Sequence, residues 1–274
     1  MKVIQISDTH FGTVREPVAE ALLRLVEQET PDLAILSGDI TQRARTREFD
    51  DARAFMDRLH VPERLVIPGN HDIPLYNLPA RAFAPYAGFQ RVFGEDLEPA
   101  FENDLLLVLT VKTTRRYRHI DGEVSDEQIA RIGGRLRAAT PRQLRIVVTH
   151  QPVCVIREQD RGNLLHGHEK AVAAWAAAGA DIIMGGHIHL PYIRALHELR
   201  PGLARRVWAV QAGTALSWRI REEASNSINL IRYDTPGACT AERWDYRAED
   251  RLFALAEARE LPLDATAEPS RRTA

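Results

Sequence analysis

Two histidines lie one residue apart in the segment DIIMGGHIHLP, residues 181–191. His187 and His189 could ligate a metal ion or be ordinary polar side chains of a loop, and an isolated HxH pair does not decide between the two. The apolar residues before them read as a short buried strand, and Gly185 and Gly186 let the chain turn sharply after it. Open α/β sheets usually build their sites just beyond the carboxyl ends of strands. The pair is therefore a candidate metal-binding element if other ligands reach the same place.

Other Asp, Asn and His residues follow the ends of further strand-like runs. They are Asp8 and His10 after VIQIS, Asp39 after LAILSG, Asn70, His71 and Asp72 after LVIPG, and His150 after RIVVT. Any one of these would be ordinary, because DxH, GD and NHD are common in turns, helix starts and solvated loops. Together with the HxH pair, however, they place carboxylate, amide and imidazole groups after five strands. This arrangement favours one shared site at a single edge of the sheet.

The motifs DTH, GD, GNHD, TH and GHIH, in this order, resemble those of the calcineurin-like metallophosphoesterases over roughly residues 1–190. Chain length and the lack of an extra domain make the class III cyclic nucleotide phosphodiesterases the most similar subgroup. The resemblance implies an α/β fold, a layered α/β/β/α sandwich of two mixed sheets flanked by helices. It also implies a dinuclear metal site. Asp39 would bridge the ions, with Asp8, His10 and His189 completing one metal and Asn70, His150 and His187 the other.

The implied chemistry is phosphoester hydrolysis, because two divalent ions roughly 3.5–4 Å apart can activate water and neutralise charge that develops on phosphate. By resemblance, a hydroxide bridging the ions attacks phosphorus, and His71 protonates the leaving group or stabilises the transition state. His71 and the bridging Asp39 are thus the candidate catalytic residues. Asp72 either orients His71 or is a solvated or helix-capping aspartate. The mixed donors suit two transition-metal ions per chain, drawn from Mn, Fe, Zn, Ni or Co, and the absence of cysteine ligands argues against a structural zinc.

A phosphodiesterase acting on small diesters, with 3′,5′-cyclic nucleotides as candidate substrates, agrees best with these motifs. A binding scaffold that has lost catalysis would typically lack a ligand or the histidine of GNHD, and here each position is filled. Ser/Thr protein phosphatases carry GDxVDRG and GNHE, where this chain has GDITQR and GNHD. A phosphomonoesterase or a nuclease of the superfamily is a further alternative, although the repair nucleases have added domains and basic surfaces.

Strand-like and helix-like segments alternate along the chain, which predicts the layered α/β architecture. Strands are expected at 3–7, 33–37, 64–68, 105–112, 144–149 and 181–184, and amphipathic helices at 17–28 and 49–59. Ser125 and Gln128 form a capping box for a helix that reaches about Arg137, and an alanine-rich helix runs from near His168 to Gly179. Three further β-segments follow residue 206, which we expect to form a second sheet or an antiparallel extension.

We expect one metallophosphoesterase domain over residues 1–250, followed at 251–274 by a C-terminal helix and a frayed tail. Residues 73–103 form a long excursion between two strands, and excursions of that length often face substrate.

Several other side chains are weaker candidates for the site. His166 and His168 form a second HxH pair, but they precede a helix instead of ending a strand, so we interpret them as loop and helix-start residues. Four arginines near the predicted site, namely Arg43, Arg115, Arg116 and Arg118, are candidates for contact with the phosphate or a base.

Composition limits the partners that we expect. The net charge of −2 offers no field that would attract nucleic acid or an anionic membrane, so we predict a small-molecule phosphodiester substrate and no stable nucleic-acid complex. The only cysteines, Cys154 and Cys239, are consistent with a reducing compartment. No apolar run resembles a signal peptide or a membrane span. We therefore expect a cytoplasmic protein, either a monomer or a homodimer.

Overall fold

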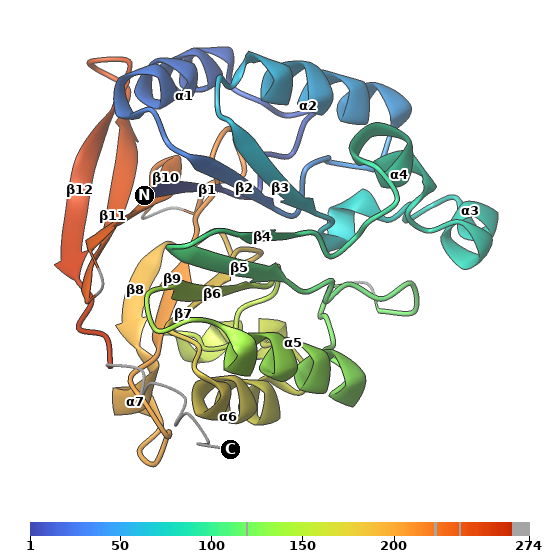
Figure 1. The fold of residues 1–274 in the computed structure, drawn as a ribbon. Helices are drawn as coiled ribbons and strands as arrows, with labels where there is room; N and C mark the ends of the chain where they lie inside the picture. Colours follow the sequence, from blue (N-terminus) through green and yellow to red (C-terminus); the bar gives the residue numbers. More distant parts are fainter. Residues whose placement is uncertain (119, 222–223, 236, 265–274) are drawn as a thin grey trace.

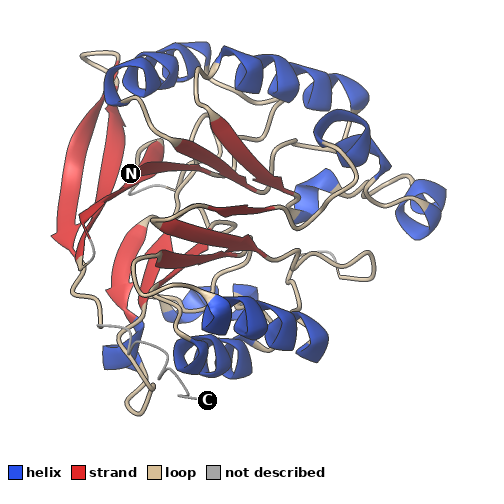
Figure 2. Ribbon diagram, viewed as in Figure 1, coloured by secondary structure: helices blue, strands red, loops and turns tan. Residues whose placement is uncertain are grey.

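The computed structural model describes residues 1–118, 120–221, 224–235 and 237–264. Two six-stranded sheets pack face to face, and helices cover the outer face of each (Figures 1 and 2). The layered α/β/β/α sandwich expected from the sequence is confirmed.

The first sheet has the strand order β12-β11-β10-β1-β2-β3. Its strands are β1 (Lys2–Ile6), β2 (Leu33–Ser37), β3 (Glu63–Ile67), β10 (Ser227–Thr235), β11 (Ala238–Arg247) and β12 (Leu252–Glu260). The strands β1, β2 and β3 are parallel, whereas β10, β11 and β12 extend the sheet beyond β1 in antiparallel pairs.

The second sheet has the order β4-β5-β6-β7-β9-β8. Its strands are β4 (Ala100–Glu102), β5 (Leu106–Thr110), β6 (Leu144–Val148), β7 (Ile182–Gly185), β8 (Tyr192–Ala195) and β9 (Trp208–Gln211). The central strands β5, β6, β7 and β9 are parallel, and the two edge strands are antiparallel to their neighbours.

Helices form the two outer layers. They are α1 (Glu16–Glu29), α2 (Thr46–Arg58), α3 (Leu78–Phe83), α4 (Ala87–Phe93), α5 (Asp126–Ala138), α6 (His168–Ala178) and α7 (Leu196–Leu199), with short 3₁₀ turns η1 (Asn70–Asp72) and η2 (Glu158–Asn163). In Figure 1, α1 and α2 lie over the first sheet, and α5 and α6 over the second. The predicted capping box opens α5, because Ser125 Oγ accepts from the Gln128 N–H and the Ser125 N–H donates to Gln128 Oε1.

Three apolar layers hold the sandwich together. Strand residues such as Ile35, Val108 and Ile146 fill the space between the sheets. Buried side chains of α1 and α2 cover the outer face of the first sheet, and those of α5 and α6, including the fully buried Trp175, cover the second. All five residues of β2, β5 and β6 are buried, as expected for parallel strands covered on both faces.

Two predictions for the C-terminal third need correction. The expected helix after residue 250 is wrong: residues 252–260 form β12, which pairs with β11. The segment LFALAEARE opens with five apolar residues and alternates apolar and polar residues only from Ala256 to Arg259, so its local pattern does not exclude a helix. The expected frayed tail falls largely on residues 265–274, which lie outside the described residues. Among the described residues, no helix is both long and apolar enough to cross a membrane.

The expected position of the segment after residue 206 is only half right. Strands β10 and β11 do extend the first sheet in antiparallel fashion, but β9 enters the second sheet parallel to β7. Because β9 runs parallel to β7, the loop that follows β9 begins at the same edge of the molecule as the loops after β1, β2, β3, β6 and β7; its described residues are 212–221 and 224–226.

Candidate metal centre

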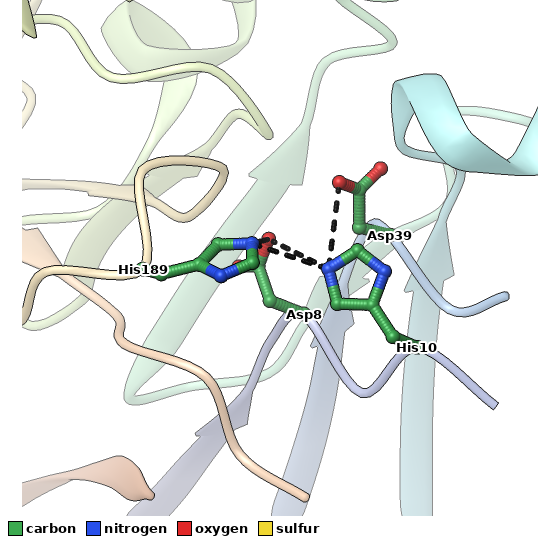
Figure 3. Close-up of side chains that lie close together, drawn as sticks. All are labelled: Asp8, His10, Asp39 and His189. Atoms are coloured by element: carbon green, nitrogen blue, oxygen red, sulfur yellow. Dashed lines mark hydrogen bonds and ion pairs between the residues drawn. The ribbon is translucent and has the colours of Figure 1, made fainter. Parts of the chain in front are cut away.

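Four predicted site residues meet where β1 and β2 end (Figure 3). Asp8, His10, Asp39 and His189 each offer a potential ligand atom, and these atoms lie within 4.8 Å of one another. Nε2 of His189 lies 3.2 Å from Nε2 of His10 and 3.3 Å from Oδ1 of Asp8. Electron-pair donors from two sheets therefore converge on one point.

A second group adjoins the first and shares Asp39 with it. Ligand atoms of Asp39, His150 and His187 lie within 4.8 Å of one another. Nε2 of His150 is 3.2 Å from Oδ1 of Asp39 and 3.3 Å from Oδ1 of Asn70. The structure thus brings together all seven residues predicted as metal ligands, and Asp39 belongs to both groups.

The backbone at these positions is unusual. Five candidate ligands have positive φ, namely Asp8 (53°), His10 (44°), Asp39 (48°), His187 (74°) and His189 (57°). Non-glycine residues pay roughly 1–3 kcal/mol for such conformations, which cluster at functional sites. Each of these residues lies two or four positions after the end of β1, β2 or β7. The strain favours a site that is held in place by the surrounding fold.

Two glycines let the strand ends approach closely enough to share ligands. Gly38 has φ of +96°, and a Cβ there would overlap the His150 ring. A Cβ at Gly69 would overlap the backbone nitrogen and Oδ1 of Asp39. The glycines of GD and GNHD are therefore required by contact between neighbouring strand ends.

Hydrogen bonds orient the imidazoles so that Nε2 faces the centre. Nδ1–H of His150 donates to the Ser37 carbonyl at 2.9 Å, and Nδ1–H of His189 donates to the Arg219 carbonyl. In its neutral form, each ring held in this way carries a lone pair on Nε2. His187 is partly buried and both of its ring nitrogens are fully buried, yet neither has a hydrogen-bond partner among the described residues. Unpartnered buried nitrogens beside ionised carboxylates fit the donor set of a divalent transition metal.

Burial keeps two of the imidazoles neutral. It lowers the pKa of His10 to about 3 and that of His187 to about 4, so both retain a free lone pair at pH 7. Burial also lowers the pKa of His150, but the charge of Asp39, the hydrogen bond to it and the charge of Asp8 together outweigh burial and raise that pKa to about 9. His150 therefore holds a proton at neutral pH that a cation would have to displace.

Both central carboxylates are ionised at neutral pH. Burial raises the pKa of Asp8, but the hydrogen bond and charge of His189 overcome it and bring the pKa to about 2. Burial likewise raises the pKa of Asp39, and the charge of His150 then holds it well below its ordinary value. Two ionised carboxylates within reach of four imidazoles form a donor set suited to cations.

The remaining residues of GNHD have distinct places. The imidazole of His71 faces the cavity beside the two groups, and its Nδ1–H donates to the Gln42 carbonyl at 2.9 Å. Asp72 is buried, and its carboxylate accepts from the backbone nitrogens of Gly69 at 2.8 Å, Ile40 at 3.1 Å and Thr41 at 2.8 Å. Asp72 is therefore not solvated, and its carboxylate bonds to backbone N–H groups instead of the His71 ring. The bond to Gly69, the N-cap of η1, agrees with the helix-capping alternative, and the bonds to Ile40 and Thr41 tie together the loops after β2 and β3.

A cavity of about 450 Å³ opens over the two groups. Asp39, Asn70, His71, His187 and His189 line it, joined by residues outside the predicted site: Gln42, Arg43, Ile73, Leu75, Ile120, Asn163 and Arg219. Ile73 and Leu75 come from the start of the excursion at 73–103, so that segment does reach the cavity.

Only one of the four candidate arginines is among the described residues that line this cavity, namely Arg43. Arg115 donates to Gln128, Arg116 to the Ala82 carbonyl, and Arg118 to Asp121 and Glu123. Sequence reasoning missed Arg219, whose loop follows β9. Arg219 could have been predicted only if the direction of β9 were known, because a strand parallel to β7 brings the loop that follows it to the edge of the sheet where the site lies. His168 opens α6 and His166 precedes it, as interpreted from the sequence.

The two-sheet sandwich, with two His/Asp groups sharing a carboxylate at the strand ends, defines a metallophosphoesterase with a candidate dimetal site. Residues 1–191 match the calcineurin-like phosphoesterase family, and the chain belongs to this family.

Two named relatives are distant in sequence. The chain is 24% identical over 204 residues to a probable cyclic nucleotide phosphodiesterase of Synechococcus sp., which covers 71% of this chain and 75% of that protein. It is 25% identical over 202 residues to a probable glycerophosphodiester phosphodiesterase GpdQ of Arcobacter nitrofigilis, covering 69% of this chain and 72% of the relative.

Solved structures show the same fold. A dimetal phosphatase from Danio rerio superposes with a TM-score of 0.69 at 12% identity, over 96% of this chain and 99% of that one. The purple acid phosphatase PPD1 from yellow lupin gives 0.75 at 13% identity over 96% of this chain. This chain spans about half of the lupin protein, 53%.

Proposed function

We propose that this protein is a dinuclear-metal-dependent phosphodiesterase that hydrolyses small phosphodiesters, with 3′,5′-cyclic nucleotides as candidate substrates. The observation that carries the proposal is the pair of adjoining His/Asp groups that share Asp39 beside an open cavity. The preference for diesters over monoesters is supported by the two distant relatives, which carry phosphodiesterase names.

In this proposal the seven donors hold two divalent ions, with Asp8, His10 and His189 on one side of Asp39 and Asn70, His150 and His187 on the other. When bound, the ions would supply a nucleophile at neutral pH and neutralise the charge of the phosphate in the transition state. The hydrogen bonds to Ser37 and Arg219 fix His150 and His189 in the tautomer that this role requires.

His71 contributes acid catalysis in the proposed reaction. Its Nδ1–H is held by the Gln42 carbonyl, so Nε2 is the nitrogen that faces the cavity. A proton on Nε2, which requires that Arg219 no longer donates to this nitrogen, can pass to the oxygen of the leaving alcohol as the ester bond to phosphorus breaks. The backbone N–H of His71 meanwhile donates to Asp39 at 2.9 Å, which fixes the imidazole relative to the shared carboxylate.

Cavity size and charge support a small substrate. A volume of about 450 Å³ lies in the range of small-molecule sites. The chain carries a net charge of −2, which does not favour a stable nucleic-acid complex. The partner that we propose is therefore a small phosphodiester.

The test is an activity panel with Mn²⁺-supplemented protein. Substrates are cyclic AMP, cyclic GMP, 2′,3′-cyclic nucleotides, bis(p-nitrophenyl) phosphate and the monoester p-nitrophenyl phosphate, with EDTA-treated protein as the control. We expect diester hydrolysis that disappears on chelation. Equal or faster turnover of the monoester would make the protein a phosphomonoesterase, and no turnover at full metal loading would favour a binding scaffold.

A further inference from the structure

Arg219 reaches the candidate site from a loop outside residues 1–191, the part of the chain that matches the family. Its side chain is half-buried and lines the cavity. Nη1 donates to Nε2 of His71 at 3.0 Å and lies 3.3 Å from Oε1 of Gln42. The guanidinium therefore meets His71 at the nitrogen that faces the cavity.

The loop that carries Arg219 is held on several sides. The Arg219 carbonyl accepts from His189 and, at 2.8 Å, from the Thr214 hydroxyl. The next residue back, Trp218, donates its backbone N–H to the Thr13 carbonyl at 3.1 Å, and the Arg15 guanidinium lies 4.2 Å from its ring centroid. The guanidinium is thus presented to the cavity from a fixed backbone.

Arg219 differs from Arg221 and Arg118 in charge pairing. Arg221 pairs with Asp160 at 2.8 Å, and Arg118 pairs with Asp121 at the same distance. Among the described residues, Arg219 has no carboxylate in ion-pair contact, and its side-chain partners are an amide oxygen and an imidazole nitrogen. Because both acceptors are uncharged, the positive charge of this half-buried guanidinium remains available to bind an anion. A phosphate oxygen is a stronger acceptor than either the amide oxygen or the imidazole nitrogen.

We propose that Arg219 binds a non-bridging oxygen of the substrate phosphate, an inference that rests on the proposed phosphodiesterase function. On binding, the guanidinium exchanges its hydrogen bond with His71 for one with the phosphate. Nε2 of His71 no longer accepts from Arg219 and can then carry a proton that faces the leaving oxygen. Arg219 is on this account a substrate-binding residue, and the same exchange couples phosphate binding to the orientation of His71.

The experiment measures binding of inorganic phosphate to the metal-loaded protein by titration calorimetry. The variants are Arg219→Met, Arg219→Lys and the control Arg47→Met, which removes one charge from an arginine whose side chain is 91% exposed on α2. Metal content is measured for each variant. We expect Arg219→Met to weaken phosphate binding roughly 10- to 100-fold, the range for a lost charge-assisted hydrogen bond. Lysine should restore part of the affinity, and Arg47→Met should match the wild type.

Metal content should remain unchanged in Arg219→Met, because the carbonyl that accepts from His189 belongs to the backbone. For a diester substrate, KM should rise with the phosphate dissociation constant. Wild-type affinity for phosphate in Arg219→Met would overturn the inference, and so would loss of metal, which would make Arg219 structural. If the wild type binds phosphate but does not hydrolyse diesters, the proposed function is contradicted, whereas the role of Arg219 in binding phosphate is not.

Discussion

The backbone N–H of His71 donates to Oδ1 of Asp39 at 2.9 Å, while the imidazole of the same residue faces the cavity. One residue thus has two separable parts. Its main chain helps to hold the carboxylate that both metal-ligand groups share, and its side chain is available to substrate. A substitution of the side chain leaves the main-chain contact in place.

His71→Ala should therefore keep the fold and both metals yet lose activity. General acid catalysis contributes typically about 10²–10⁴-fold, so we expect a fall of that order in kcat for a substrate with a poor leaving group, such as a cyclic nucleotide. Nitrophenolate needs little protonation, so the loss on bis(p-nitrophenyl) phosphate should be much smaller. Steady-state kinetics on both substrates, with metal analysis of the same sample, make the measurement.

An exposed histidine provides the control for this variant: His60→Ala should behave as the wild type. Equal losses on the two substrates would point to charge stabilisation or positioning by His71 instead of proton transfer. Loss of metal from His71→Ala would show that the side chain is structural.

Gly69→Ala should damage the site without touching a ligand. A Cβ at this position would overlap the backbone of Asp39, so one of the two strand ends must move. We expect a destabilisation of roughly 1–3 kcal/mol together with weaker metal binding. Gly134→Ala on α5 is the matched control, because a Cβ there meets no atom within 4 Å. That control should be stabilised by roughly 0.5–1 kcal/mol. Urea unfolding of both variants distinguishes these outcomes, and equal stabilities would contradict the close packing of Gly69 on Asp39.

Metal uptake should release protons at pH 7. The pKa of His150 is raised to about 9, and that of His189 is also raised. The metal-free protein therefore carries an extra proton on the His150 imidazole at neutral pH. A ligand imidazole must give up that proton, so uptake should release about one proton or more per chain. The release should fall as the pH approaches about 9, where His150 is already partly neutral. Calorimetry in two buffers of different ionisation enthalpy counts the protons; no release at pH 7 would mean that His150 is not a ligand.

Much of the site could be predicted from the sequence because its residues directly follow strands. Parallel strands carry whatever comes after them to one edge, so DTH, GD, GNHD, TH and GHIH had to converge once the sheets were recognised. The predicted strands at 33–37 and 144–149 lie within one residue of the observed β2 and β6. Buried parallel strands are legible because they are nearly continuous apolar runs.

Arg219 and Asp72 could not be placed in the same way. The role of Arg219 depends on β9 lying parallel to β7, and strand direction is a property of pairing that no local pattern encodes. Asp72 follows a strand like the ligands do, yet its carboxylate is used by three backbone N–H groups. Asp72 differs from a ligand only because of how the loops after β2 and β3 lie relative to each other in the folded protein. The strand β12 was missed because a short amphipathic segment can agree with both the helical period of 3.6 residues and the strand period of two.

The most direct test of the dinuclear site is the metal content of wild type and Asp39→Ala, measured by plasma mass spectrometry after reconstitution with Mn²⁺ and removal of excess metal. The carboxylate of Asp39 belongs to both ligand groups, so its loss leaves two like charges without a shared counter-charge. We expect close to two ions per chain in the wild type and in the control Asp57→Ala, whose carboxylate is half exposed on α2. We expect neither ion to remain in Asp39→Ala. One ion or none in the wild type, or two ions retained by Asp39→Ala, would contradict a dinuclear centre bridged by this residue.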